Sequence, residues 1–405
     1  MDASAQGINA VRGNRVMSGQ EPTSDQQGSE EPYRVLSLDG GGMRGIYTAA
    51  FLARMVDQFA RLRELESLDL GAGFDLITGT STGAIVGAAI AIGRPLGEVV
   101  ALYQKEGHKI FPHRIKGGAS AIYRAARGDA YVRRGDKALR AALTEVLGAT
   151  TMRDVFVGRR ISLSIPAVLM SSHQAYVFKK TPVSGVRDDE FPLVDVCMAS
   201  SAAPVFRSLA AIGVPGDEAA GSLVFADGGL WANNPVLVGL TDALANAAGR
   251  RIEIYSLGTC PRPEGELIDA EDAHRSMLDW RFGADVGPLS ISAQEFAFDN
   301  MARLIGNAFT QCGRPVRTIR FPATKVPASM MPYLALDDTR PEAMTRLVQQ
   351  AHRDADLTKS WCDDPNSQEG RLICALMNDL PAMPATGADW VRPSAAAGDK
   401  EENDV

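Results

Sequence analysis

Two apolar stretches near the start of the chain each lead directly into a glycine-rich turn, and this arrangement limits the fold more than any other feature. Residues 33–38 (YRVLSL) precede the turn at 39–45 (DGGGMRG), and residues 74–78 precede the turn at 79–83 (GTSTG). A helical pattern follows each turn, the first with apolar side chains at spacings of three and four, the second with small residues. Strand, tight turn and helix in succession predict a mostly parallel sheet with helices on both faces.

The same alternation continues to about residue 265, and helical patterns dominate beyond it. Segments 1–31 and 386–405 are polar and lack periodicity, which indicates a disordered arm and a disordered tail. Between them we expect an α/β domain over 32–265 and a helical portion over 266–385 packed on this core. The further strands expected are 160–166, 175–178, 223–226 and 252–257, and the further helices are 290–312 and 340–361.

The composition excludes several classes of protein. Hydrophobic residues make up 45% and charged residues 22% of the 405 positions, as in an ordinary globular protein, and the net charge of -7 argues against a nucleic-acid partner. Five scattered cysteines without a C-x-x-C pair suit a reducing cytoplasm and indicate no zinc site. No apolar run reaches the ~18 residues that span a bilayer, and no secretory signal is visible. We therefore expect a cytoplasmic protein that meets membranes only from their surface.

The second glycine turn has the form G-x-S-x-G, which is typical of a nucleophile on a sharp turn between strand and helix. Gly79 and Gly83 would let the strand and the helix pass closely, since neither carries a Cβ. Ser81 would stand at the positive end of the following helix, where developing negative charge is favoured. The pattern predicts Ser81 as a catalytic nucleophile.

A serine needs a base, and the chain offers two kinds of candidate. Only five histidines are present, and none lies in a motif that would direct it at Ser81, although His274 follows Asp227 in the chain order known from α/β-hydrolases. Asp227 itself comes at the end of an expected strand, before Gly228-Gly229, at the edge where α/β sheets place their sites. By itself, the Asp-Gly pair would also fit a hairpin turn.

The first glycine turn admits two interpretations. Its spacing satisfies G-x-G-x-x-G, the dinucleotide-binding pattern, with Glu64 or Asp69 available as the ribose acid. The same backbone amides at a helix start could instead hold the oxyanion of a reacting ester, with Arg44 as a cation beside them. The second interpretation also uses Ser81 and Asp227, which the first leaves without a role. A P-loop is excluded, because no Gly-Lys-Ser/Thr follows.

Taken together, the three motifs DGGGMRG, GTSTG and Asp227-Gly-Gly resemble the signatures of the patatin-like phospholipases. The stretches RGDKAL at 134–139, ASSAAPVF at 199–206 and SLGT at 256–259 agree with this resemblance, which covers about residues 33–260. The family implies a three-layer α/β/α fold and a Ser-Asp dyad that cleaves the acyl esters of lipids without a metal or other catalytic cofactor. Carried over by motif, Ser81 is the nucleophile and Asp227 the base. The oxyanion hole then comprises Gly40, Gly41, Gly42, Met43 and Arg44.

A weaker and narrower resemblance is to the bacterial effector phospholipases of anti-phage defence, which are activated by cyclic dinucleotides. It implies a cyclic dinucleotide ligand, a phospholipid membrane surface as substrate and action at the inner face of the membrane; a homodimer stays open. A mixed apolar and basic stretch could bind lipid headgroups or nucleotide phosphates, or could simply be a solvated loop. The basic residues concerned are Arg114, Lys116, Arg133 and Arg134.

Overall fold

The computed structural model describes residues 31–111, 118–217, 219, 221–260, 268–283, 285–322 and 326–384, with backbone alone for 118–129 and 281. Arg114 and Lys116 lie outside the described residues, as do the tail 386–405 and all of the arm except Glu31. The division at residue 265 lies outside them as well and stays a prediction.

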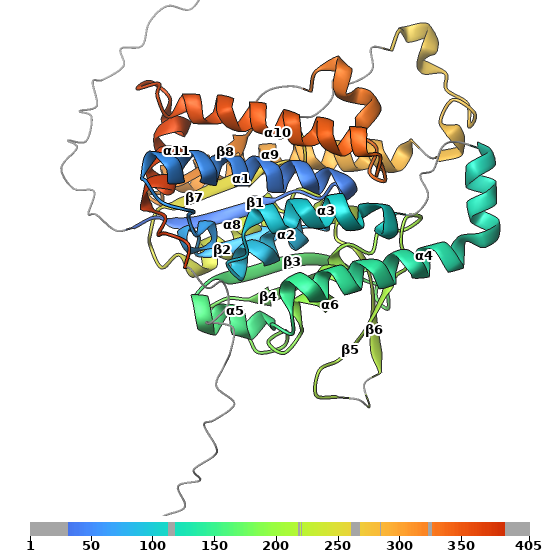
Figure 1. Cartoon of the computed structure of the whole chain (residues 1–405), viewed down its shortest axis with the longest axis horizontal. Coiled ribbons are helices and arrows are strands. Elements are labelled where there is room, and N and C mark those ends of the chain that lie inside the picture. The colour runs from blue at the N-terminus through green and yellow to red at the C-terminus, as the bar shows by residue number, and fades with distance from the viewer. Residues whose placement is uncertain are drawn as a thin grey trace, which may run out of the picture. The chain divides into compact units, whose positions relative to one another are not determined.

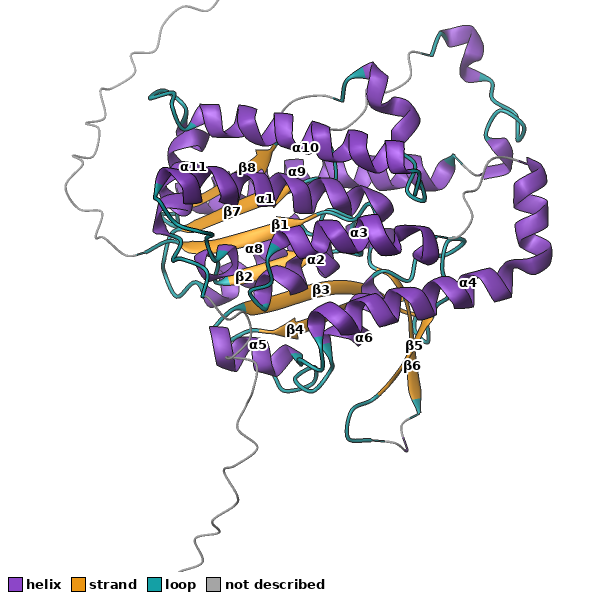
Figure 2. Ribbon diagram, in the orientation of Figure 1, coloured by secondary structure: helices purple, strands orange, loops and turns teal. Residues whose placement is uncertain are grey.

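An eight-stranded sheet forms the centre of the described chain, in the order β5-β6-β3-β2-β1-β7-β8, with β4 paired to β3 (Figures 1 and 2). Five neighbouring strands of this order, β3, β2, β1, β7 and β8, run parallel to one another. Strands β4 and β6 pair with β3, and β5 pairs with β6, in antiparallel fashion. The mostly parallel sheet expected from the alternation is confirmed. The strands are β1 (Tyr33–Leu38), β2 (Leu76–Gly79), β3 (Ser162–Leu169), β4 (Gln174–Lys180), β5 (Ala210–Gly213), β6 (Ser222–Asp227), β7 (Ile252–Leu257) and β8 (Val316–Phe321).

Helices cover both faces of this sheet and complete the three layers. Successive side chains of a strand point to opposite faces, so Leu36 and Leu38 of β1 pack with the helices α1, α2 and α3, whereas Val35 packs with α8 and α9. The helices are α1 (Gly45–Leu62), α2 (Thr82–Ala91), α3 (Leu96–Ile110), α4 (Gly118–Leu147), α5 (Met152–Arg159), α6 (Leu193–Ser200), α7 (Gly229–Ala232), α8 (Val236–Asn246), α9 (Val286–Gln311), α10 (Pro341–Trp361) and α11 (Gln368–Asp379).

Strand β8 differs from the sequence-based expectation, because it lies in the portion predicted to be helical. Its sequence, VRTIRF, contains two arginines, which interrupt the apolar run expected of a strand in a buried sheet. The strand nevertheless pairs in parallel along the whole of β7, from Ile252↔Val316 to Leu257↔Phe321. The C-terminal portion therefore extends the sheet itself, in addition to packing helices on it.

Strand β5 (Ala210–Gly213) is also absent from the sequence-based prediction. It has only four residues and forms an antiparallel pair with β6. So short a segment carries too few alternations to be recognised as a strand.

Candidate active site

Ser81 occupies a strained turn between β2 and α2. Its backbone has φ 55° and ψ −117°, a region that side chains other than glycine seldom enter. The glycines around it allow this geometry: a Cβ on Gly79 would lie 2.4 Å from the carbonyl oxygen of Gly83, and one on Gly83 would lie 2.2 Å from that of Leu38. The Ser81 N–H donates to Ser200 Oγ at 2.9 Å, which anchors the turn. The turn therefore has the tight backbone that G-x-S-x-G predicted.

Asp227, the last residue of β6, lies beside Ser81. The Ser81 side chain is close enough to the Asp227 carboxylate to lower its pKa, and the Gly229 N–H donates to Asp227 Oδ1 at 2.6 Å. The two side chains belong to residues that are only 9% and 6% exposed, so little water reaches the pair. The structure thus brings together the two residues that the motifs singled out, although 145 positions separate them in the chain.

Burial sets the proton affinity of this carboxylate. It raises the pKa of Asp227 to about 6, while the Gly229 amide, the Ser81 hydroxyl and the charge of Arg207 act in the opposite direction. A carboxylate with such a pKa is ionised at neutral pH and holds a proton more readily than an exposed aspartate. Asp227 can therefore accept the proton of Ser81.

Arg207 is a charged residue of the site that the sequence reasoning did not identify. Its guanidinium is buried and donates to Asp136 Oδ1 at 2.6 Å, while its charge also acts on Asp227. The signal was present, since Asp136 belongs to RGDKAL and Arg207 directly follows ASSAAPVF. The same stretch positions the dyad through its backbone, because Ala202 O accepts from the Asp227 N–H at 3.0 Å.

The first glycine turn lies next to the nucleophile turn, since the Thr80 N–H donates to Leu38 O at 3.1 Å. It passes through a short 3-10 helix, Gly42–Arg44, into α1, so its amides lie at the N-terminal end of an 18-residue helix. Arg44 Nε donates to the Gly41 carbonyl at 3.4 Å and so braces the turn. This arrangement supplies donors for an oxyanion beside Ser81.

Only some of the expected amides are free to bind an oxyanion. The Gly40 N–H donates to Asn233 O at 2.9 Å and the Met43 N–H donates to Leu336 O at 2.8 Å. In the part of the chain that the structure describes, the N–H groups of Gly41 and Gly42 donate to no protein acceptor. The Arg44 N–H also has an acceptor, Gly41 O at 3.1 Å. The oxyanion hole over Gly40 to Arg44 stays a prediction, in which only the Gly41 and Gly42 amides are without a protein acceptor among the described residues.

A buried ion pair stabilises the start of the first glycine turn. Arg320 of β8 donates to both carboxylate oxygens of Asp39, one of these bonds being 3.1 Å long, and to Ser256 Oγ at 2.9 Å. A Cβ on Gly258 would lie 3.0 Å from Arg320 Nη2, so the glycine leaves room for the pair. Burial raises the pKa of Asp39, and Arg320 opposes this through its charge and its hydrogen bonds. The sequence reasoning missed Arg320 because it missed β8.

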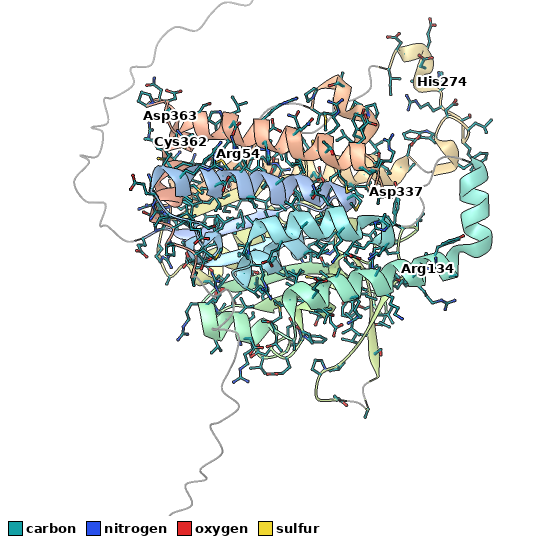
Figure 3. All side chains as sticks on the ribbon, viewed as in Figure 1. Arg54, Arg134, His274, Asp337, Cys362 and Asp363 are labelled. Carbon is teal, nitrogen blue, oxygen red and sulfur yellow. The ribbon has the colours of Figure 1, made fainter. Side chains whose placement is uncertain are left out.

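The other candidate residues lie apart from the dyad or have partners of their own. Arg133 and Arg134 are exposed on α4, and His274 is exposed beyond β7, as Figure 3 shows for Arg134 and His274. Asp69 precedes β2, at the opposite edge of the sheet from the glycine turns, and its carboxylate accepts from Arg159 at 2.6 Å. It is therefore placed poorly to serve as a ribose acid for the glycine turn.

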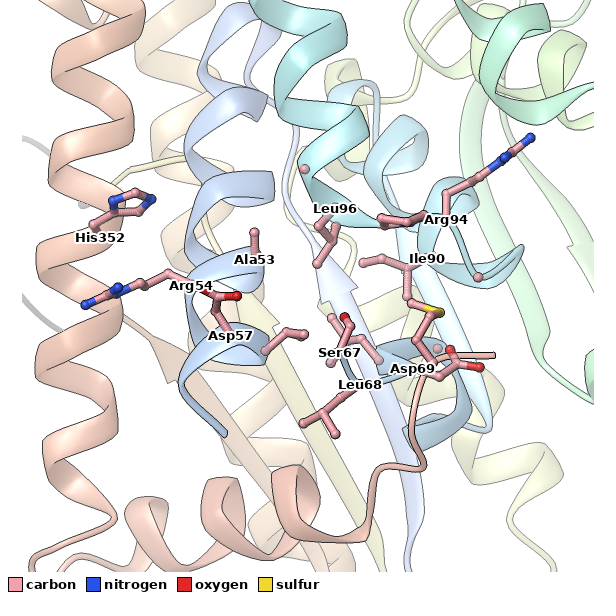
Figure 4. A pocket seen from close by; sticks show the side chains of 17 residues that line it. Ala53, Arg54, Asp57, Ser67, Leu68, Asp69, Ile90, Arg94, Leu96 and His352 are labelled. Atoms are coloured by element: carbon pink, nitrogen blue, oxygen red, sulfur yellow. The ribbon is translucent and has the colours of Figure 1, made fainter. Parts of the chain in front are cut away.

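A cavity of about 290 Å³ opens between α1, the end of α2 and the start of α3 (Figure 4). Its lining includes Ala53, Ile90 and Leu96, and it contains neither Ser81 nor Asp227. Arg54, at its rim, is already bonded to Asp356 at 2.8 Å. This cavity is thus separate from the candidate active site.

The described residues contain no group of three or more His, Cys, Asp or Glu side chains placed to hold a metal ion. None of the helices over these residues is both long and apolar enough to pass through a bilayer.

Comparison with known proteins identifies relatives of the chain. A family model described as Patatin-like phospholipase matches residues 36–240. A protein named cGAMP-activated phospholipase from Pseudomonas aeruginosa is 34% identical over 289 residues, which cover 69% of this chain and 77% of that protein. A cGAMP-activated phospholipase from Escherichia coli is 34% identical over 58% of this chain and 65% of its own length. A cUMP-AMP-activated phospholipase from Escherichia coli is 31% identical, with coverages of 60% and 70%.

Proposed function

The chain belongs to the patatin-like phospholipase family, and from this membership we propose that it is a serine acyl hydrolase that cleaves the acyl esters of membrane phospholipids. One observation carries the assignment of the reacting groups: Ser81, in a strained turn, lies beside the buried carboxylate of Asp227 and lowers its pKa. A hydroxyl held in this way, beside free amides at a helix start, has the parts that acyl transfer needs.

The reaction follows from these positions. Asp227 accepts the Ser81 proton as Oγ attacks the ester carbonyl, and the Gly41 and Gly42 amides receive the charge that forms on the carbonyl oxygen. Collapse of this intermediate breaks the ester bond, and the leaving lysophospholipid oxygen takes the proton from Asp227. Water, deprotonated by Asp227, then attacks the acyl-serine. The bond from the acyl carbon to Ser81 Oγ breaks, Asp227 returns the proton to Oγ, and the fatty acid leaves. Each backbone N–H that donates to the oxyanion stabilises the transition state by about 3 to 4 kcal/mol.

The regulatory part of the proposal is activation by a cyclic dinucleotide, at the cytoplasmic face of the membrane and in defence against phage. Its support is that three similar proteins are named for activation by cGAMP or by cUMP-AMP. Because these relatives respond to different nucleotides, their names do not assign one to this chain. We therefore propose the ligand class, a cyclic dinucleotide, and not a particular member.

The test uses purified protein, phospholipid vesicles and a panel of cyclic dinucleotides. Fatty-acid release should require one of the nucleotides and should disappear in Ser81→Ala, whereas Ser172→Ala, at an exposed turn, should behave as the parent. A fluorophosphonate probe should label the parent and Ser172→Ala but not Ser81→Ala. Full hydrolysis by Ser81→Ala would overturn the nucleophile, and equal activity with and without every nucleotide would show a constitutive lipase.

A further inference from the structure

Exposed apolar side chains are concentrated in one segment of the described chain. Nineteen large apolar side chains are exposed among the residues that the structure describes, and ten of these lie from Ile268 to Ile305. Among them, Met277 and Leu278 are each 70% exposed and Phe282 is 72% exposed. Monomeric proteins seldom expose so many apolar side chains together unless the surface binds something.

Helix α9 carries part of this surface as a stripe. At 100° per residue, Val286, Leu289, Phe296 and Leu304 project within an arc of about 80°, and all four are at least half exposed. The buried side of the same helix is formed by Asp299, Ala302 and Gly306. The stripe is therefore an outward face of a helix whose other face is already packed.

This surface borders the candidate active site. Helix α9 packs on α7, which begins two residues after Asp227, and Gln294 Oε1 of α9 accepts from the Asn233 N–H at 2.9 Å. Leu230 of α7 is 55% exposed, and Val205, in the loop that carries Arg207, is 75% exposed. In Figure 1 the start of α9 and the segment before it lie at the end of the sheet where β1 gives way to α1. The exposed stripe thus belongs to a helix that adjoins the element following Asp227.

The charges of the segment decide between two ways of meeting a membrane. Residues 268–305 contain seven acidic and three basic residues, a net charge of −4 without the histidine. A surface of this sign is repelled by anionic headgroups. Attraction must then come from the apolar side chains entering the headgroup and acyl boundary.

We propose that the surface formed by Met277, Leu278, Phe282, Leu289, Phe296 and Leu230, the apolar rim, inserts into phospholipid bilayers. The inference rests on the proposed function, since it presents Ser81 to acyl esters at the membrane. A second copy of the chain on the same rim would keep these side chains away from the bilayer. Insertion of this kind depends on apolar contact and persists at high salt, unlike binding through Arg133 and Arg134.

The test measures binding separately from hydrolysis. Ser81→Ala protein is sedimented with vesicles of phosphatidylcholine or of phosphatidylglycerol, at about 0.1 M and about 1 M NaCl. We expect binding to phosphatidylcholine vesicles at both salt concentrations. Binding to phosphatidylglycerol vesicles should be stronger at the higher salt concentration than at the lower one. Adding Leu289→Asp and Phe296→Asp should weaken binding at least tenfold. The matched control is Leu62→Asp. Leu62 is 65% exposed at the C-terminal end of α1, so this variant should bind vesicles as strongly as the parent protein does.

Three results would overturn the proposal. The first is undiminished binding by the double aspartate variant, and the second is loss of binding at high salt. The third is a parent dimer that the double substitution converts to monomers, because the apolar rim would then be an interface between two copies of the chain. Circular dichroism and sedimentation velocity verify folding and mass. With Ser81 present, the ratio of vesicle hydrolysis to hydrolysis of a monomeric short-chain ester should fall at least tenfold in the variant. Vesicle binding without phospholipid hydrolysis in the presence of any cyclic dinucleotide of the panel would reject the proposed function and leave the apolar rim in place.

Discussion

Two buried aspartates flank the site, and they differ in what faces them. Asp39 follows β1 and Asp227 ends β6, each directly before a glycine pair, and they are 1% and 6% exposed. Asp39 receives two hydrogen bonds from Arg320. Asp227 receives none from an arginine, because the nearby Arg207 donates to Asp136 instead. Its own hydrogen-bond donor is the Gly229 amide, and the Ser81 side chain lies close enough to lower its pKa.

This difference separates a supporting carboxylate from a reactive one. A proton on Asp39 would break a buried ion pair, so Asp39 is suited to hold the glycine turn in place. Burial raises the pKa of both carboxylates, to about 7 for Asp39 and about 6 for Asp227. Only Asp227 has Ser81 beside it and no arginine bonded to its oxygens, so it can take up the serine proton and return it. Similar local sequences thus acquire different chemistry from the arginine that the fold places near them.

The largest expected effect is the loss of activity in Asp227→Asn. The amide cannot accept the proton of Ser81, and we expect kcat to fall by about 10² to 10⁴. Asp39→Asn, the matched variant, should keep the dyad and lose much less of kcat. Both are checked by initial rates on one ester substrate at neutral pH. Equal losses in the two variants would remove the distinction between the carboxylates.

A large effect on stability is expected in Arg320→Met. The change leaves Asp39 buried without its counter-ion, close to Glu295 and Asp299, and should lower the free energy of unfolding by about 3 to 5 kcal/mol. Equilibrium unfolding in urea measures this change. The double variant Arg320→Met with Asp39→Asn should recover part of the loss, because it removes the uncompensated charge. No recovery would show that Arg320 stabilises the fold through other contacts.

The pH dependence of activity should report Asp227. The base must be unprotonated, so activity should fall about tenfold per pH unit below a pKa of about 6 and level off above it. We expect this limb in kcat/KM of the free enzyme, measured with an ester that does not itself titrate. A profile that stays flat down to pH 4 would mean that Asp227 is not the base.

The smallest expected effect is a displacement of that limb in Arg207→Gln. The charge of Arg207 lowers the pKa of Asp227, so its removal should move the acid limb to higher pH while activity on the plateau changes little. Arg207→Lys keeps the charge and should leave the limb nearer its original position. A limb that does not move in Arg207→Gln would show that Asp136 already neutralises the arginine.

The sequence by itself determined the local parts of the site. The spacing of Gly79, Ser81 and Gly83 is a steric requirement of a tight turn, so it can be recognised without knowing the fold. The same is true of the glycine turn after β1 and of the strand that ends at Asp227. Each pattern lies within a few residues, where covalent geometry limits the choices.

The tertiary structure decided which of these parts have partners and which stay free. Arg320 reaches Asp39 from 281 positions away, because β8 pairs with β7 in the sheet. The Leu336 carbonyl accepts the hydrogen bond of the Met43 N–H. The fold also brings Arg207 close enough to Asp227, at the end of β6, for its charge to lower the pKa of Asp227. Charge and hydrogen bonding act through space, so the partners of a buried group depend on where the chain returns after hundreds of residues.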